Sequence, residues 1–516
     1  MADACTIPPD WARLVNRGWD PSGERGADLI IVPKPPNYMG TFINTSHSGP
    51  YDFLQEVPLI FRGAGIREMG PVAMDREVTL ADIAPTVAQL MGFDFPLRDG
   101  TPITQAIVPG AAIPKLVVTV SLDGGGWNVL NKFPDAWPNI DELIGEGASI
   151  ENAIVGSSPS ITPAIHTNIS TGAWPQHHGV TAIAIRSKRG EIVGAFSKSS
   201  NYTGPIVDPS ASLRLQTLGD LWDRANENAP KVGLLASGNY PLGMLGHGAS
   251  VDGGDKDVAA LLEEGTGQWQ RDPRYYSRPP ELNDDLDSLQ ASRDALDRQD
   301  GKADGKWLNH SLEEIAMGNT PVAAGWVEEA TETVISQEQF GQDNLTDLLY
   351  VHFKSPDHVG HKWNMISPEM GEVINSVDDA IGELVEWLDE RVGKDLYTLV
   401  LTADHGQTPL EAGGWPISRD ELHADVQRGF DHVQNDQGII MRTSATSFFM
   451  NKGEMKRNGV TSGKVASFLS RYTIGENSPG SGDLPTEFRD RAEERIFRAV
   501  FPGSKLPKIV ACTRDD

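Results

Sequence analysis

Apolar residues gather along this chain in short continuous runs. The most pronounced runs cover residues 116–122, 348–353 and 397–403. A continuous apolar run of this length predicts a strand that is buried on both faces, as in a parallel α/β sheet. Shorter apolar runs predict two further strands at residues 28–33 and 57–61.

Amphipathic segments separate these runs and predict helices. We expect helices over residues 80–91, with Thr79 as the N-cap, and over residues 138–145 and 368–392. Alternating strands and helices favour an α/β fold with a mostly parallel central sheet flanked by helices.

A further helix is expected after Ser157. Pro163 at its first position and Gly172 just beyond its end frame a helix of about nine residues, which places Thr162 at the N-cap. Free backbone N–H groups and the helix dipole favour an anion at that end. Thr162 is therefore a candidate nucleophile for phosphorus, and the alternative is an ordinary capping threonine.

The chain is expected to consist of five segments. The more polar middle, residues 191–345, is expected to be an inserted cap region. The last segment is expected to combine a smaller insertion with a return to the core. The boundaries are 1–110, 111–190, 191–345, 346–410 and 411–516.

Charge and cysteine content exclude several classes of protein. The 44 Lys and Arg residues face 72 Asp and Glu residues, which gives a formal net charge of −28. Such a charge repels nucleic acid and anionic membranes, so anionic substrates would need local metal cations. The two cysteines, Cys5 and Cys512, exclude a cysteine-based zinc site.

No membrane helix and no signal peptide is expected. No apolar run approaches the ~18 residues that a membrane helix requires, and residues 1–5 lack a basic segment followed by an apolar one. Compartment and oligomeric state stay open.

Metal-competent side chains follow several of the predicted strands. Carboxylates and imidazoles suit zinc and neighbouring divalent metals, and two metals about 4 Å apart need about six such ligands. Because ligands of α/β proteins bind at the carboxyl ends of strands, these side chains should meet at one sheet edge. They are Asp123, Asp357, His361, Asp404 and His405, joined by His47 from a Gly-rich loop before an apolar strand.

Several motifs together resemble the alkaline phosphatase superfamily, and within it the nucleotide pyrophosphatase/phosphodiesterase (type I phosphodiesterase) branch. They are Asp123-Gly124, the Thr162 segment continuing through residues 171–179, Asp357-x-x-x-His361 and residues 402–406. The resemblance implies a nucleophilic Thr162 and two metal ions, most simply zinc. One metal would take Asp357, His361 and another histidine, and the other would take Asp123, Asp404 and His405, with Thr162 bridging toward it.

The third histidine of the first metal suggests a circular permutation. In the family it lies in a segment that follows the Asp-His-Gly strand, whereas a similar segment here, residues 45–61, stands at the front. His47 is then the expected ligand, and His423 and His432 are the competitors. If the chain is permuted, Cys5 and Cys512 would be near neighbours that could form a disulfide.

One departure concerns phosphoryl binding. Family members often carry an asparagine where this chain has Ile183 and Ala184, and Arg186 is a candidate replacement donor. The expected function is two-metal hydrolysis of phosphodiester or nucleotide pyrophosphate bonds in a small molecule, through a phosphothreonine. Alternatives are a phosphomonoesterase, a phosphonate or sulfate ester hydrolase, a phosphomutase and a non-catalytic binding relic. Family members are often exported.

Overall fold

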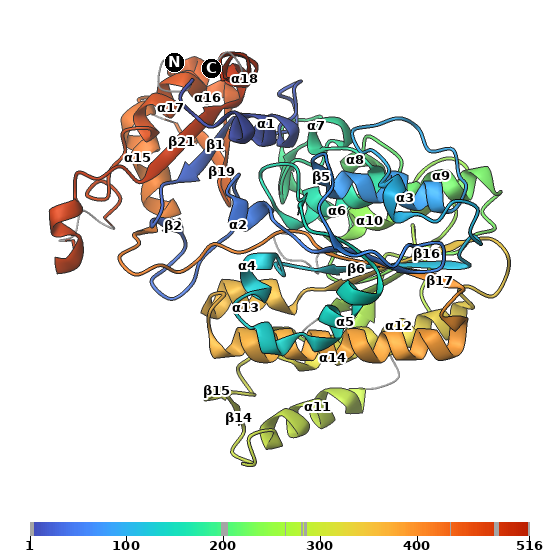
Figure 1. Cartoon of the computed structure of the whole chain (residues 1–516). Helices are drawn as coiled ribbons and strands as arrows, with labels where there is room; N and C mark the ends of the chain where they lie inside the picture. The colour runs from blue at the N-terminus through green and yellow to red at the C-terminus, as the bar shows by residue number, and fades with distance from the viewer. Residues whose placement is uncertain are drawn as a thin grey trace.

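A nine-stranded sheet forms the centre of the protein in the computed structural model (Figure 1). The structure describes residues 5–197, 205–263, 265–279, 282, 286–433, 435–478 and 484–513. The strand order across the sheet is β13-β12-β11-β16-β6-β17-β3-β7-β4.

Three buried parallel strands occupy the middle of this sheet. They are β6 (Leu116–Leu122), β16 (Asp347–Phe353) and β17 (Tyr397–Ala403), and every residue in them is buried. Val117 pairs with Leu348 on one side and with Thr398 on the other, so the three strands end at the same level. The predicted strands and α/β fold class are confirmed.

The outer strands make the sheet mixed. β11 (Val232–Ser237) and β12 (Val258–Glu263) continue the parallel part, and β3 (Leu59–Gly63) runs antiparallel to β17. The remaining strands are β13 (Gln268–Gln270), β7 (Ala148–Ile150) and β4 (Gly70–Val72).

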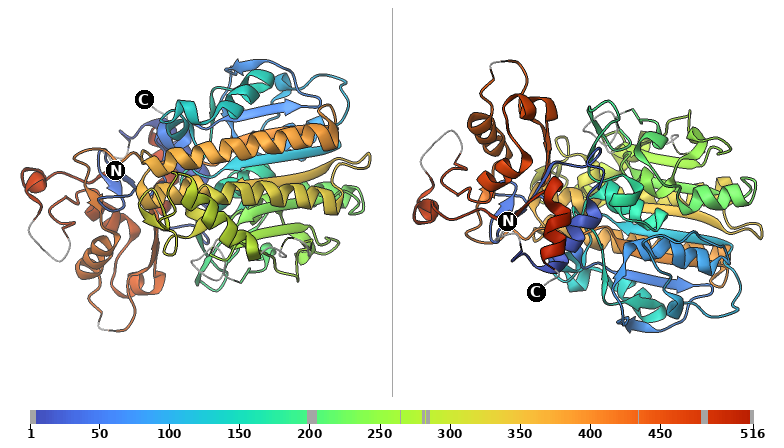
Figure 2. Two further views of the ribbon diagram at one scale, coloured as in Figure 1. Left: turned by 90° about the horizontal axis from the view of Figure 1, so that it is seen from below. Right: turned by 90° about the horizontal axis from the view of Figure 1, so that it is seen from above.

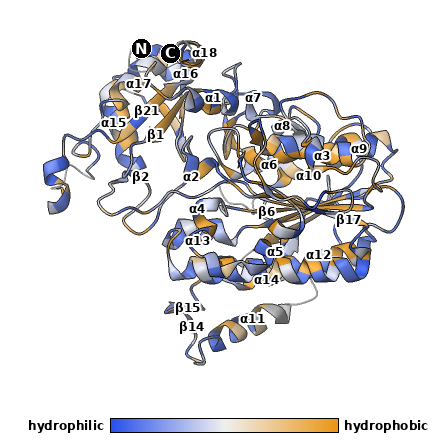
Figure 3. Cartoon of the chain, viewed as in Figure 1, coloured by the Kyte–Doolittle hydropathy of each residue, from blue (hydrophilic) through white to orange (hydrophobic). Residues whose placement is uncertain are grey.

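Helices cover both faces of the sheet (Figures 1 and 2). One layer contains α5 (Pro138–Glu146), α12 (Val322–Glu338), α13 (Ser355–Trp363) and α14 (Pro368–Leu388). The other contains α3 (Ile83–Leu90), α6 (Thr162–Thr171), α9 (Leu218–Ala225) and α10 (Leu242–Leu245). Colouring by hydropathy shows the apolar strands enclosed between these layers (Figure 3).

A second, smaller unit combines the two ends of the chain. Its antiparallel sheet has the order β19 (Ile440–Ser444), β20 (Ser447–Met450), β1 (Leu29–Pro33) and β21 (Phe497–Pro502). The strand predicted at residues 28–33 therefore exists, but it pairs with β20 and β21 instead of joining the central sheet.

The expectation of an inserted cap at residues 191–345 needs correction. β11, β12 and β13 from this segment extend the central sheet, and α12 packs against α14. The sequence around these short strands is polar, and for that reason the segment was expected to be an insertion. In this segment, α11 (Leu286–Arg298) with β14 (Lys306–Trp307) and β15 (His310–Ser311) stands outside the helical layers (Figure 1).

Short elements complete the chain. The strands are β2 (Tyr38–Met39), β5 (Val78–Thr79), β8 (Ala153–Ile154), β9 (Ala184–Arg186), β10 (Ile192–Gly194) and β18 (Pro416–Ile417). The helices are α1 (Pro9–Gly18), α2 (Asp52–Gln55), α4 (Trp127–Leu130), α7 (Pro175–His178), α8 (Pro209–Ser212), α15 (Arg419–Phe430), α16 (Lys452–Arg457), α17 (Ser462–Leu469) and α18 (Leu506–Cys512). Among the described residues, no helix is both long and apolar enough to cross a membrane.

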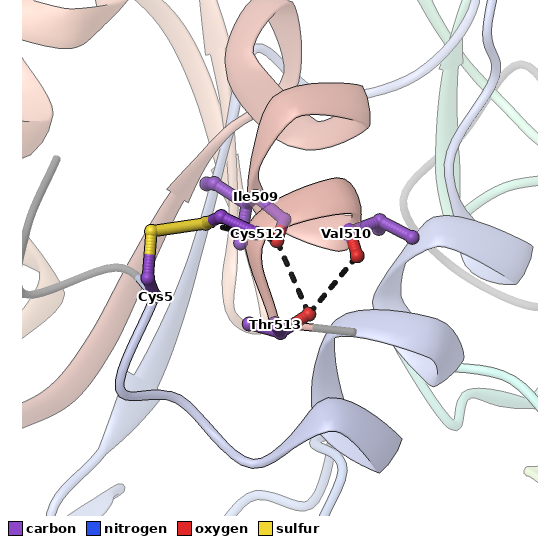
Figure 4. Close-up of a disulfide and its surroundings, with 5 residues drawn as sticks. All are labelled: Cys5, Ile509, Val510, Cys512 and Thr513. Atoms are coloured by element: carbon purple, nitrogen blue, oxygen red, sulfur yellow. Dashed lines mark hydrogen bonds between the residues drawn. A yellow bond between two sulfur atoms is a disulfide. The ribbon is translucent and has the colours of Figure 1, made fainter. Parts of the chain in front are cut away.

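A disulfide joins Cys5 to Cys512 across a sequence separation of 507 residues (Figure 4). The two Cα atoms lie 5.3 Å apart, and α1 packs against α18 beside the bond. The predicted proximity of the two cysteines is confirmed. A permuted chain requires its two ends to lie together in this way, and the permutation itself stays a prediction.

We expect Cys5→Ser to lower the free energy of unfolding by about 2–4 kcal/mol, because the open chain gains conformational entropy when it unfolds. Denaturant titration of the oxidised protein and the variant measures the difference. The reduced wild-type protein is the control and should match the variant. Equal stability of the oxidised and reduced wild type would contradict this expectation.

Candidate active site

The carboxyl ends of the three central strands bring the predicted site together. Asp123 follows β6 directly, Lys354 follows β16, and Asp404 follows β17. All three residues are buried, with exposed fractions of 0%, 2% and 0%. Gly124 makes the turn after Asp123 with a φ of +70°, and a Cβ there would lie only 3.1 Å from the Asp357 Cα.

His47, Asp357 and His361 form the first group of metal-competent side chains. One ligand atom from each lies within 4.8 Å of the others. His47 Nε2 is 3.1 Å from Asp357 Oδ1, and His361 Nε2 is 3.4 Å from the same oxygen. Asp357 lies in the first turn of α13 and His361 one turn later, so one helix face presents both.

Asp123, Asp404 and His405 form the second group, and their ligand atoms also lie within 4.8 Å of one another. His405 Nε2 is 3.5 Å from Asp123 Oδ1 and 3.3 Å from Asp404 Oδ2. The rings of His47 and His405 stack with their centroids 3.6 Å apart, so the two groups are adjacent.

Backbone carbonyls orient all three histidines in the same way. The Nδ1 atoms of His47, His361 and His405 lie 3.1, 3.3 and 3.0 Å from the carbonyl oxygens of Ser160, Thr45 and Gly406. A carbonyl only accepts, so Nδ1 carries the proton and Nε2 presents its lone pair to the site. This is the arrangement in which imidazole binds metal.

Thr162 lies beside the second group. Its Oγ1 is 3.3 Å from Asp123 Oδ2, and Thr162 is the first residue of α6. The predicted helix is confirmed, but the N-cap is Ile161 and not Thr162, because the helix begins one residue before Pro163. The Thr162 hydroxyl therefore points toward Asp123 instead of capping the helix.

Lys354 is the residue that the sequence analysis missed. Its ammonium donates to Asp123 Oδ2 at 2.9 Å, to Asp357 Oδ2 at 2.6 Å and to Thr162 Oγ1 at 3.4 Å. It thus joins both groups and the threonine. The sequence did contain a sign of this role, since Lys354 stands between a buried strand and Asp357. A lysine buried at such a position needs carboxylate partners.

The site is a strongly coupled set of charges. Burial, the largest single effect, raises the pKa of Asp123, but the Lys354 ammonium and the hydrogen bond and charge of His352 together hold the pKa below its usual range. Burial also raises the pKa of Asp357, and His361 and Lys354 reverse that effect. Burial and the Asp123 charge raise the pKa of Asp404. Burial, followed by the charge of His47, lowers the pKa of His405 to about 3, so its imidazole is neutral at pH 7.

These residues fit divalent metal ions. Asp404 Oδ2 and His405 Nε2 are buried and make no hydrogen bond with any described residue. A buried polar atom without a partner is costly, and coordination to a cation would remove that cost. Mixed carboxylate and imidazole ligands suit zinc and its neighbours.

The other predicted residues lie elsewhere. His423 is on α15 and His432 follows that helix, and neither belongs to a metal-competent group in the described parts of the chain. The structure does not bring Arg186 to the site, because its guanidinium donates to Asp28 and to the Met450 carbonyl at 2.8 and 3.0 Å.

A cavity of about 680 Å³ leads from the first group to the second unit. His47 and His361 line one end, Ile183 lies in its wall, and Arg442 reaches it from β19. Burial raises the pKa of Tyr240, while the charges of Arg442 and Lys354 lower it. Arg442 is a basic residue of this cavity that the sequence patterns did not single out.

The family described as type I phosphodiesterase / nucleotide pyrophosphatase matches residues 117–476, and the chain belongs to this family. The matched range contains Thr162 and every predicted metal ligand except His47.

Individual relatives agree with this assignment. Alkaline phosphatase PhoV of Synechococcus elongatus is 25% identical over 58% of this chain and 60% of that protein. Alkaline phosphatase PafA of Elizabethkingia meningoseptica is 24% identical over 57% of this chain and 60% of that protein. The chain thus spans less than two thirds of these relatives. A crystal structure of PafA, 19% identical, covers 75% of this chain and 84% of its own with a TM-score of 0.57, which supports a common fold.

We expect His47→Ala to lower the zinc content of the purified protein toward one ion per chain, because His47 belongs to only one of the two groups. Elemental analysis after dialysis measures the content. His432→Ala, outside both groups, is the matched control and should keep the wild-type value. Zinc loss in His432→Ala with none in His47→Ala would contradict the assignment of His47.

We expect Lys354→Met to tighten zinc binding by about tenfold or more. The Lys354 ammonium lies a few ångströms from the metal ligands, so its positive charge repels a bound cation, and the substitution removes that repulsion. Titration of the metal-depleted protein by calorimetry measures this affinity. Lys452→Met, in the second unit, controls for the change in net charge. Weaker binding in Lys354→Met alone would show that the ammonium supports the metal-bound geometry.

Proposed function

We propose that this protein hydrolyses phosphoric esters, with Thr162 as the nucleophile beside two divalent metal ions, most simply zinc. The convergence of Thr162 with the two ligand groups carries the proposal. Its hydroxyl lies 3.3 Å from Asp123, at the N-terminus of a ten-residue helix, while three imidazoles present Nε2 to the adjacent space.

The two groups divide the metal ligands between them. His47, Asp357 and His361 would hold one ion, and Asp123, Asp404 and His405 the other, with Thr162 next to the second. When bound, such ions lower the pKa of a hydroxyl or a water and stabilise charge on the phosphoryl oxygens.

The chain's own residues orient the reaction. Asp123 accepts from the Thr162 hydroxyl and holds its oxygen toward the site. The free N–H groups at the start of α6 favour the phosphoryl oxygens as Thr162 attacks phosphorus and the ester oxygen leaves. Water then cleaves the resulting phosphothreonine and regenerates the hydroxyl.

Phosphodiesters or nucleotide pyrophosphates are the proposed substrates. Ile183 stands in the cavity wall and cannot donate to a phosphoryl oxygen, which suits a diester with one fewer charged oxygen than a monoester. Arg442, rather than Arg186, would contact the substrate, because it lines the same cavity as His47 and His361. Phosphomonoesters are the second candidate, favoured by the names of PhoV and PafA.

Hydrolysis of bis-p-nitrophenyl phosphate and p-nitrophenyl phosphate, with added zinc, tests the proposal. We expect the diester to be preferred and Thr162→Ala to lose on the order of 10³-fold or more in kcat/KM, because a covalent nucleophile has no substitute. Thr162→Ser keeps a hydroxyl and is the matched control. Full activity of Thr162→Ala would exclude the threonine mechanism, and a preference for the monoester would select the second candidate.

We expect Arg442→Met to raise KM by about tenfold, which corresponds to the loss of one charge-assisted hydrogen bond of about 1.4 kcal/mol. Steady-state kinetics on the same two esters measures the change. Lys452→Met, from the same unit, removes an equal charge outside the cavity and should leave KM unchanged. An unchanged KM in Arg442→Met would place substrate binding elsewhere in the cavity.

A further inference from the structure

Three aspartates meet at the sheet edge opposite the active site. Asp223 comes from α9, and Asp255 and Asp257 come from the loop that leads into β12. β12 runs parallel to β11, which in turn runs parallel to β16. The start of β12 therefore lies at the amino edge of the parallel strands, whereas Asp123 and Asp404 lie at their carboxyl edge.

The three carboxylates are close together and largely shielded from water. One oxygen from each lies within 4.8 Å of the others. Asp223 and Asp257 are 4% and 6% exposed, and Asp255 is half-buried. The three side chains line one small cavity together with Gly253 and Gly254.

One oxygen in this cluster has no partner. Asp223 Oδ1 is buried and makes no hydrogen bond with any described residue. Neighbouring buried acids differ in this respect. Asp220 accepts from the Thr217 and His247 backbones and from the His247 ring, and Asp347 accepts from the Lys231 and Gly341 backbones. The nearby acids therefore accept from N–H donors at both oxygens. The Asp223 carboxyl instead shares a hydrogen bond with the Asp257 carboxyl, and its Oδ1 has no donor among the described residues.

Arg224 lines the same cavity, but its guanidinium donates to Gln216 Oε1, and it forms no ion pair with the cluster among the described residues. Within the described residues, no ion pair joins Asp223, Asp255 or Asp257 to a lysine, arginine or histidine. Burial is the largest cause that raises the pKa of all three carboxyls. The charge of Asp255 raises the pKa of Asp223 and Asp257 further, while the hydrogen bond between these two carboxyls lowers the pKa of Asp223 and raises that of Asp257. Ionised carboxylates packed in this way require a cation.

The spacing fits a calcium ion. Ca²⁺ binds oxygen ligands at about 2.3–2.6 Å, so two of its ligands can be at most about 5 Å apart. The three carboxylate oxygens, which all lie within 4.8 Å of one another, satisfy this condition. An all-carboxylate set suits a hard cation and does not favour zinc, which prefers nitrogen and sulfur. The half-buried side at Asp255 would admit the water ligands that calcium also accepts.

We propose that Asp223, Asp255 and Asp257 bind a calcium ion that fastens α9 to the start of β12. The site is structural. It would join a helix of the outer layer to a strand near the edge of the central sheet, where β12 is followed only by the short β13. The proposal does not depend on the function proposed for Thr162.

Thermal unfolding and calorimetry with CaCl₂ test the proposal on the full chain after removal of bound metal by a chelator. We expect calcium to raise Tm by several degrees in the wild type, because an ion that binds only the folded state stabilises it. The same rise is expected in Asp404→Asn, since that substitution affects only the active site.

Asp223→Asn/Asp257→Asn should lose the calcium response and one calcium ion per chain by calorimetry. Its Tm without calcium should equal or exceed that of the wild type, because the substitutions remove repulsion between buried charges. Asp300→Asn/Asp304→Asn, from an exposed acidic segment, is the matched control and should respond like the wild type.

Three outcomes would overturn the proposal. The first is that the wild type binds no calcium. The three carboxyls would then be held together by shared protons and not by a cation. The second is a calcium response that persists in Asp223→Asn/Asp257→Asn but disappears in Asp404→Asn, which would place the ion at the active site. The third is a response to MgCl₂ alone, which would exclude calcium as the ligand.

Discussion

The register of the three central strands is the constraint on which the rest of the structure depends. β6 pairs in parallel with both β16 and β17, and the paired positions bring Leu122, Phe353 and Ala403 to the same level. The next residues along each strand therefore emerge together. Because a shift by one residue would turn each side chain to the opposite face, this register decides whether Asp123 and Asp404 can meet at all.

The sequence allowed this part of the structure to be predicted well. Continuous apolar runs located β6, β16 and β17, and Gly172 marked the end of α6, where it adopts the left-handed conformation with a φ of +62°. Six metal-competent residues predicted at strand ends and loops do lie together in the structure. Five of them follow predicted strands, and His47 lies in a Gly-rich loop before one. The family resemblance was needed to prefer His47 over His423 and His432.

The remaining features depend on contacts between distant segments. β11 and β12 become strands of the central sheet only by pairing beside β16, so their polar surroundings suggested an insertion. Likewise β1 joins β20 and β21, more than 400 residues away in the sequence. Arg186 was predicted to contact the phosphoryl group because it stands near Ile183 in the sequence. In the structure its guanidinium donates to Asp28 instead. Such partners cannot be found from local patterns.

The two units of the protein meet around the site. The second unit supplies Arg442 from β19, and the loop that carries His47 follows β1 and β2. β1 is held on both sides, by β20 and β21, and the disulfide ties its end of the chain to α18. A ligand on a loop needs such support, because metal geometry tolerates only small displacements. The antiparallel sheet therefore anchors the start of the segment that leads through β2 to His47.

Buried charge is balanced differently at the two edges of the central sheet. At the carboxyl edge, Lys354 lies 2.9 Å from Asp123 and 2.6 Å from Asp357, and histidines surround Asp404. At the amino edge, Asp223 and Asp257 have no such cation among the described residues. Charges of one sign can share a buried space only when protons or cations are taken up with them. Backbone N–H groups satisfy Asp220 and Asp347 at the same edge, so the lack of an N–H donor at Asp223 Oδ1 is a property of that cluster and not of the edge as a whole.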